Sequence, residues 1–307
     1  MIASRLFAPR TQVWPERAGW ATHTQGQSRL LLLDPLLRDL GSFALPADAL
    51  GVHGATRDGS RLAVSALQRV VVIDHAGREL WQFEHPSWGD GGSERGSCCF
   101  SADDRVVWAH VPRDWSPDEW VVLDAETAEV MGRAGLSCKS AGSQAVPHPD
   151  RRHVGLAVGE GQDGSRVYWG SVQEGSVAVN EYPALERVLA GISPSGEVFV
   201  TTPHSEGPLQ VHRFPDGSIM GSLEPETVFG DGDDDGFNFS AGFPEDRIVV
   251  FTGGERGSLY MAPIDNLNDW QELHVPEFRA NPQVTVAHGL CLLSDWGNGS
   301  FHVLQLA

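Results

Sequence analysis

Long apolar segments are absent from this chain of 307 residues. No run approaches the roughly 18 residues that a membrane-spanning helix needs, and a stretch such as Leu30 to Leu33 is only as long as a strand. The N-terminus, MIASRLFAPR, also lacks the basic start, apolar middle and small-residue cleavage site of a secretory signal. We therefore expect a cytoplasmic protein that does not associate with membranes.

Cysteine is scarce, and the four residues are Cys98, Cys99, Cys138 and Cys291. Two of them are adjacent and the others are far apart, so the pattern excludes a dense disulfide framework and predicts reduced thiols. Cys98 and Cys99 fall in a predicted strand, and no base that could activate them is identifiable nearby. We interpret both as buried structural residues.

Basic residues are outnumbered by acidic ones. The 22 Lys and Arg residues face 41 Asp and Glu residues, which gives a formal net charge of −19 at pH 7. Lys139 is the only lysine, which we interpret as codon bias. A polyanion would be repelled over most of such a surface, so nucleic-acid binding is not expected, whereas cationic partners are attracted.

The sequence does contain a repeat of nearly constant length. Seven polar turns, each followed by an apolar, strand-forming run, begin at residues 16, 58, 103, 150, 195, 245 and 288. The intervals between them are 42, 45, 47, 45, 50 and 43 residues. A period of about 40 to 50 residues that carries four short strands is typical of a β-propeller blade. The sequence thus predicts an all-β fold, a seven-bladed β-propeller of four-stranded antiparallel blades, in which residues 1–307 form a single domain and a monomer.

All four strands of a blade, which we name A to D in chain order, can be recognised in the second repeat. They read GVHGATR, RLAVSAL, RVVVIDH and RELWQFE, with turns at Asp58-Gly59 and Ala76-Gly77. In four repeats strand C ends in an aliphatic residue followed by Asp, at Leu33-Asp34, Ile73-Asp74, Leu123-Asp124 and Ile264-Asp265.

These features resemble the WD-repeat propellers, whose strand C ends in Trp-Asp and whose A–B turn is commonly Ser-Pro-Asp-Gly. Ser193-Pro194-Ser195-Gly196 and His148-Pro149-Asp150 look like that turn, and the four Asp residues look like the strand-C Asp. The chain departs from the family in having no Trp-Asp and no Gly-His dipeptide. The resemblance covers nearly the whole chain and implies the fold, not the partner or the activity.

The seventh repeat supplies only three strands before the chain stops at Ala307. Residues 4–10, SRLFAPR, precede the first blade and are otherwise unassigned. We predict that this N-terminal segment pairs as the outer strand of the last blade and covers an exposed sheet edge. The alternative is a frayed N-terminus on a ring of six blades.

Propeller geometry places the D–A and B–C loops on one face, here called the loop face, and the A–B and C–D turns on the other, the turn face. Two D–A loops, residues 85–97 and 225–236, and two B–C loops, residues 110–118 and 159–165, are unusually long. Long loops gathered on one face of a rigid scaffold usually carry binding function. Tryptophans in such loops are typical interface hot spots, although each could instead anchor its own loop. The predicted binding residues are Trp88, Asp90, Glu94, His110, Arg113, Trp115, His204 and Trp296.

The acidic run from residue 231 to residue 236 resembles the start of a calcium loop. Asp231, Asp233 and Asp235 occupy positions one, three and five, and Gly236 occupies position six. The match degrades afterwards, because position twelve is Gly242 where a bidentate Glu is needed. Two readings stay open: a calcium site, with calcium as the one candidate cofactor, or a solvated acidic loop.

No nucleophile–base pair, nucleotide-binding motif or complete metal motif is recognisable in the sequence. His110 and His204 could reach the channel mouth, where an enzyme would place metal ligands or a general base, but a structural position at the surface or rim explains each of them better. We therefore expect a non-catalytic, protein-binding scaffold that uses the loop face to bind a partner with cationic segments. The alternative is a propeller hydrolase or lyase with a divalent cation near the channel mouth.

Overall fold

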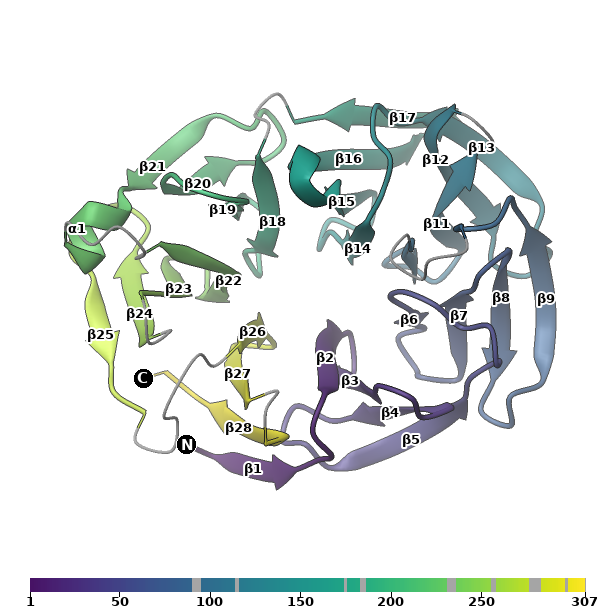
Figure 1. Ribbon diagram of the computed structural model, residues 1–307, viewed down its shortest axis with the longest axis horizontal. Coiled ribbons are helices and arrows are strands. Elements are labelled where there is room, and N and C mark those ends of the chain that lie inside the picture. Colours follow the sequence, from purple (N-terminus) through teal and green to yellow (C-terminus); the bar gives the residue numbers. More distant parts are fainter. Residues whose placement is uncertain are drawn as a thin grey trace.

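In the computed structural model, seven four-stranded antiparallel sheets are arranged as a ring around a central axis (Figure 1). The structure describes residues 1–89, 95–113, 116–173, 176–182, 186–230, 236–254, 258–275, 283–295 and 298–306. Each of the seven predicted turns joins strand A to strand B of one blade, so the period read from the sequence is confirmed as the blade repeat.

The first four blades follow one another along the chain. Blade 1 contains β2 (Thr11–Glu16), β3 (Gly19–Thr24), β4 (Arg29–Leu33) and β5 (Asp39–Ala44). Blade 2 contains β6 (Gly54–Ala55), β7 (Arg61–Ser65), β8 (Arg69–Asp74) and β9 (Glu79–Glu84). Blade 3 contains β10 (Cys98–Phe100), β11 (Val106–Arg113), β12 (Ser116–Asp124) and β13 (Val130–Gly135). Blade 4 contains β14 (Gly142–Pro147), β15 (His153–Gly159), β16 (Ser165–Gln173) and β17 (Ser176–Glu181), with the short 3₁₀ helix η1 (Gly161–Asp163) in its B–C loop.

The remaining blades complete the ring. Blade 5 contains β18 (Arg187–Ile192), β19 (Val198–Pro203), β20 (Leu209–Arg213) and β21 (Ile219–Leu223), and the helix α1 (Pro225–Phe229) follows it. Blade 6 contains β22 (Phe237–Glu245), β23 (Ile248–Gly253), β24 (Ser258–Pro263) and β25 (Gln271–Leu273). Blade 7 contains β26 (Gln283–Ala287), β27 (Leu290–Asp295), β28 (Ser300–Leu304) and β1 (Ala3–Leu6).

The N-terminal strand closes the ring as predicted. β1 pairs antiparallel with β28, from Ala3 opposite Val303 to Leu6 opposite Ser300, and is the outermost strand of blade 7. The pairing strand is shorter than the predicted segment of residues 4–10, because the chain turns away after Phe7, whose N–H donates to the carbonyl of Gly299. The alternative of a six-bladed ring is wrong.

In three of the four repeats, at Asp34, Asp74 and Asp124, the strand-C Asp is a turn-forming residue. The side chain of Asp74 accepts hydrogen bonds from the backbone N–H groups of Ala76 and Arg78, both at 3.0 Å. Asp124 accepts equivalent bonds from Glu126 and Thr127. These backbone bonds are the main reason why the pKa values of both carboxyls lie below their ordinary value. The feature that resembles WD repeats therefore stabilises the C–D turn.

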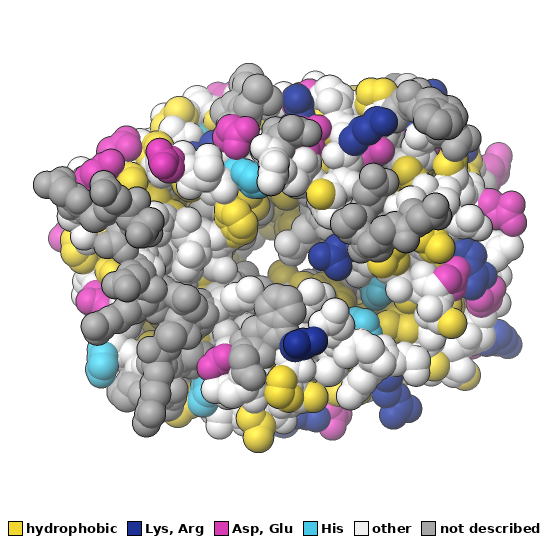
Figure 2. Space-filling view, viewed as in Figure 1, with side chains coloured by type: hydrophobic (Ala, Val, Ile, Leu, Met, Phe, Trp, Pro, Cys, Tyr) yellow, Lys and Arg dark blue, Asp and Glu magenta, His cyan; other side chains and the backbone are white. Residues whose placement is uncertain are grey.

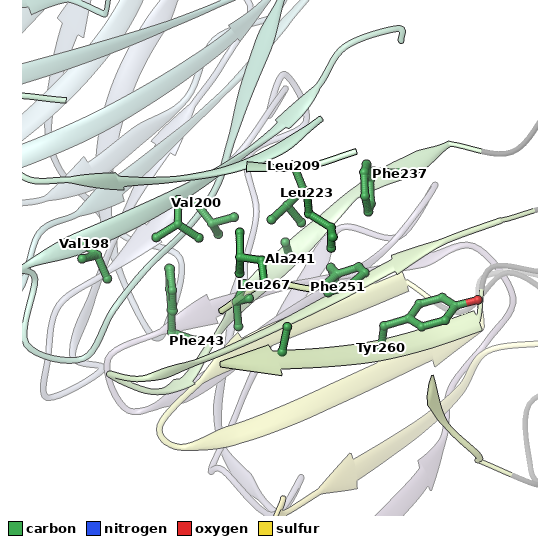
Figure 3. Close-up of a cluster of buried hydrophobic side chains, with 13 residues drawn as sticks. Val198, Val200, Leu209, Leu223, Phe237, Ala241, Phe243, Phe251, Tyr260 and Leu267 are labelled. Atoms are coloured by element: carbon green, nitrogen blue, oxygen red, sulfur yellow. The ribbon is translucent and has the colours of Figure 1, made fainter. Parts of the chain in front are cut away.

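The core consists of the layers between adjacent blades. Between blades 5 and 6, Val200 of β19 and Leu209 of β20 pack in one cluster with Phe243 of β22 and Phe251 of β23 (Figure 3). Burial of such side chains contributes roughly 1.5–3 kcal/mol each. Equivalent clusters join the other blades, so the rigid ring holds the channel-lining strands in fixed positions.

All four cysteines are buried and unpaired, and the burial of Cys98 and Cys99 agrees with the prediction. Burial raises the pKa of Cys99 to about 12 and that of Cys98 well above its ordinary value, which leaves both as protonated, unreactive thiols at neutral pH. Within the described residues, no helix is long and apolar enough to cross a membrane.

Candidate functional site

The central channel opens on both faces of the ring. The loop-face mouth is a hollow of about 560 Å³, and the turn-face mouth is a hollow of about 590 Å³. Both hollows are lined by Val52 and Gln144, which therefore mark the waist of the channel. Figure 2 shows the loop face, where the opening lies at the centre of the ring. Each mouth is large enough for a small molecule or for a few side chains of a partner.

His204 lines the loop-face mouth, as the sequence predicted. It directly follows β19, and its ring stacks on Phe239 of β22 with centroids 5.8 Å apart and an interplanar angle of 18°. Its Nδ1 lies 3.5 Å from Oε2 of Glu186, and its backbone N–H donates to the carbonyl of the same residue. Phe239 is 56% exposed. The two rings thus form a stacked aromatic platform beside a carboxylate.

Acidic side chains surround this platform on one side of the loop face. Figure 2 shows them gathered over the part of the ring that contains β20 and β21. The exposed glutamates in and beside the loops of this part of the ring, here called the acidic arc, are Glu186, Glu206, Glu224 and Glu226. Arg95 lines the opposite side of the same mouth and is exposed, and it forms no ion pair with a described residue. The mouth therefore has an acidic side and a basic side.

His110 does not reach the channel mouth, so this prediction is corrected. The residue is 0% exposed and lies within β11, because the pairing of β11 with β12 continues as far as Arg113 opposite Ser116. The predicted B–C loop of residues 110–118 is thus mostly strand. Arg113 is exposed at the end of β11, where the sequence placed it on the loop face.

Trp88 is an anchor of its own loop. Its side chain is 1% exposed, and its ring contacts those of His85 and His110, with centroids 6.2 and 5.4 Å away. Gly96 allows this packing, because a Cβ at that position would lie 2.4 Å from the Trp88 ring. The buried ring covers His110 and offers no surface to a partner, so the anchoring alternative is the one that the structure supports.

His110 belongs to a buried cluster that the sequence did not reveal. Its Nε2 lies 3.2 Å from Oδ2 of Asp118, and both groups lie close to the thiol of Cys138, with the three potential ligand atoms within 4.8 Å of one another. Burial raises the pKa of the Cys138 thiol to about 12, which disfavours the thiolate that a metal requires. On its other side, Nδ1 of His110 lies 2.8 Å from Oγ of Ser143, a residue of the loop-face mouth.

The turn-face mouth contains a carboxyl with an altered charge state. Oε1 of Glu16 accepts hydrogen bonds from Nε1 of Trp14 and the backbone N–H of Ala55, both at 3.2 Å. Although part of Glu16 is exposed to the channel, burial of its carboxyl raises its pKa to about 8. Nearby, burial lowers the pKa of His53 to about 3, so this imidazole is neutral at physiological pH.

A second cluster on the turn face joins His148, Asp150 and His153. Oδ2 of Asp150 lies 2.6 Å from Nδ1 of His153, and Nε2 of His148 donates to the carbonyl of Gly196 at 2.9 Å. His148 is also stacked on Phe214. These contacts connect the A–B turns of adjacent blades, and the cluster is accordingly a structural one.

Several predicted site residues lie outside the described part of the chain. These are Asp90, Glu94, Trp115 and Trp296 of the binding set and Asp231, Asp233 and Asp235 of the calcium loop. They stay predictions.

No protein-family model matches the sequence, and no curated protein is similar to it. Solved structures do share its fold. The β-propeller domain of Cps50 (Swd1) from Myceliophteria thermophila is 10% identical, with a TM-score of 0.66 over 99% of this chain and 98% of that one. A chain of Kuenenia stuttgartiensis hydrazine synthase is 14% identical, with a TM-score of 0.66 over 100% of this chain and 97% of that one. The protein has the fold of a WD-repeat-like β-propeller.

Proposed function

We propose that the protein is a binding scaffold that uses the loop face, around the channel mouth, to hold a cationic segment of a protein partner. The observation that carries this proposal is the exposure of Phe239. Among the large hydrophobic residues that the described chain exposes, it is the only aromatic one. It lies at the mouth of a rigid channel and is supported from below by the ring of His204.

The charges around this platform favour a cationic partner. A guanidinium stacks on an aromatic face and pairs with carboxylates, and Glu186 lies directly beside His204. The other exposed glutamates of the acidic arc would attract the same segment over a distance of about 8–10 Å. The net charge of −19 adds to this steering. Binding of a cationic segment requires an exposed aromatic ring and nearby negative charge, and the loop face has both.

The similarity of folds supports the same function at a coarser level. The Swd1 domain is a propeller, and propellers commonly present loops on one face to their partners. The hydrazine synthase chain shows that the same fold also occurs in an enzyme. The fold alone therefore does not decide between a binding protein and an enzyme. The proposal rests on the properties of the loop-face mouth.

The test is the binding of a fluorescent Arg-rich nonapeptide, with a Glu-rich peptide of the same length as its counterpart. We expect the Arg-rich peptide alone to bind, with an affinity that falls as salt rises. Phe239→Ser should weaken binding by about tenfold, since the loss of an aromatic anchor costs on the order of 1–2 kcal/mol. Ile219→Ser is the matched control, because Ile219 is also 56% exposed but lies on the outer strand β21. Equal affinities for the two variants would contradict the proposal.

A further inference from the structure

A continuous chain of hydrogen bonds leads from the loop-face mouth into the layer between blades 3 and 4. Oγ of Ser97 lies 2.9 Å from Oγ of Ser143, which lies 2.8 Å from Nδ1 of His110. Nε2 of His110 lies 3.2 Å from Oδ2 of Asp118. The backbone N–H of Ser140 donates to the same carboxylate oxygen at 2.8 Å. A serine, an imidazole and a carboxylate are thus connected in series.

The acceptor at the end of the chain sets the direction of every bond. A carboxylate only accepts, so Nε2 of His110 carries the hydrogen that is donated to Asp118. Nδ1 then has a lone pair and accepts the hydroxyl hydrogen of Ser143. This is the arrangement in which an imidazole acts as the general base of a serine nucleophile and a carboxylate holds the ring in the correct tautomer.

The burial along the chain suits that role. His110 is 0% exposed and Asp118 is 4% exposed, and the ring of Trp88 lies over His110. Ser143, in contrast, is partly exposed and lines the hollow of the mouth. The base and the carboxylate are therefore shielded from bulk solvent, while Ser143 borders the channel.

Blade 5 contains a similar network that lacks these properties. Nε2 of His212 lies 2.8 Å from Oγ1 of Thr201, and its Nδ1 lies 3.0 Å from the hydroxyl of Tyr182. Thr201 is 0% exposed, and neither ring nitrogen contacts a carboxylate. That network connects β19 and β20 of blade 5 with the residue that follows β17 of blade 4, and it is structural. Access to the mouth and the presence of Asp118 distinguish the network around His110.

The mouth also provides a cation beside the serine. Gly142 precedes Ser143, and a Cβ at Gly142 would lie 3.8 Å from Nε of Arg95. Arg95 is exposed, and it pairs with no acidic residue of the described part of the chain. Guanidinium groups bind carboxylates in bidentate geometry. A hollow of about 560 Å³ accommodates a small molecule.

We propose that Ser143 is the nucleophile of a hydrolase site that cleaves small esters bearing a carboxylate, with His110 as general base, Asp118 as positioning residue and Arg95 as the carboxylate anchor. Oγ of Ser143 attacks the ester carbonyl carbon while its proton passes to Nδ1 of His110. The adduct collapses, the bond to the alcohol oxygen breaks, and the alcohol leaves with that proton. Water, deprotonated by the same nitrogen, then attacks the acyl-serine, which releases the acid and restores the Ser143 hydroxyl.

This activity goes beyond the proposed binding function and does not depend on it. The acidic arc and Phe239 lie on the side of the mouth formed by blades 5 and 6, whereas the serine lies at blade 4 and Arg95 precedes blade 3. The alternative expected from the sequence was a hydrolase or lyase with a divalent cation. The proposed site is a hydrolase of a different kind, because its nucleophile is a serine hydroxyl.

The test uses a fluorophosphonate probe and two 4-nitrophenyl esters, the hydrogen glutarate and the neutral butyrate. We expect the probe to label the full-length protein at Ser143, as located by mass spectrometry of the digested protein. Ser143→Ala should abolish labelling and lower the rate of ester hydrolysis by on the order of 10³-fold or more. Ser165→Ala is the matched control, since Ser165 lines the same mouth but its Oγ has no hydrogen-bond partner among the described residues.

Two further variants separate chemistry from folding. Asp118→Asn should lower kcat with little change in KM, and Arg95→Gln should raise KM for the glutarate ester but not for the butyrate. Melting curves establish that each variant is folded. Wild-type protein that resists the probe, or that is labelled at a residue other than Ser143, would overturn the proposal, as would full activity of folded Ser143→Ala.

Discussion

Ala3 lies directly opposite Val303 in the antiparallel pairing of β1 with β28, so the two ends of the chain share one sheet. Removal of residues 1–10 would delete this strand and leave β28 as an unpaired edge. We expect the truncated protein to melt at least about 5 °C lower or to aggregate. The loss of several backbone hydrogen bonds, at about 1 kcal/mol each, costs several kcal/mol, and each kcal/mol lowers the melting temperature of a domain of this size by roughly 2 °C. Leu6→Ser serves as the control, since Leu6 is 74% exposed and its substitution should leave the melting temperature unchanged. A truncated protein with the wild-type melting temperature would disprove closure by β1.

Glu16 predicts a specific dependence of stability on pH. Its pKa is about 8 in the folded protein and lies near the ordinary value of 4.5 in the unfolded chain. Between these two values the unfolded chain releases a proton that the folded protein retains, so this residue lowers the stability as the pH rises from about 4.5 to 8. Glu16→Gln keeps the acceptor oxygen for Trp14 and Ala55 and removes the titration.

The variant should therefore gain melting temperature relative to the wild type at pH 9 and gain less at pH 5. Glu245→Gln, at an exposed position on the same face, should show no such difference between the two pH values. A gain for Glu16→Gln that is the same at both pH values would show that the carboxyl is not held neutral by its surroundings.

The calcium reading of the acidic loop is tested by thermal melting with calcium and with a chelator. If Asp231, Asp233 and Asp235 bind the ion, millimolar calcium should raise the melting temperature, because a ligand that binds only the folded state stabilises it. Asp233→Ala should remove the rise, and Glu206→Ala, elsewhere on the loop face, should retain it. Superimposable melting curves with calcium and chelator would establish that the loop is a solvated acidic segment.

The fold could be predicted from the sequence because its signals are local and repeated. Each A–B turn is a short polar stretch followed by an apolar run, and the strand-C Asp makes its hydrogen bonds within four residues of itself, as Asp74 does with Ala76 and Arg78. Such local signals can be recognised in the sequence without knowing how the blades are arranged in the ring. Closure was predictable for a different reason, since a blade with three strands requires a fourth.

The site was less accessible to sequence reasoning because its contacts join different blades. Ser143 belongs to blade 4 and His110 to blade 3. Asp118 contacts His110 only because β11 and β12 extend into residues 110–118, the segment that was predicted to be a loop. Trp88 illustrates the opposite case, because a tryptophan in a long loop has the composition of an interface but is buried here. Phe239 has no distinguishing signal in the sequence. It is exposed because it lies near the start of β22, at the loop-face mouth of the channel.

The most direct test of the binding function is to locate the bound peptide. A benzophenone-bearing version of the Arg-rich peptide is cross-linked to the protein by light, and the attachment sites are identified by mass spectrometry. The proposed binding function predicts attachment on the loop face, near His204 and Phe239, and a loss of these products in high salt. Attachment on the turn face instead, around Arg57, Arg151 and His288 at the opposite mouth, would contradict it.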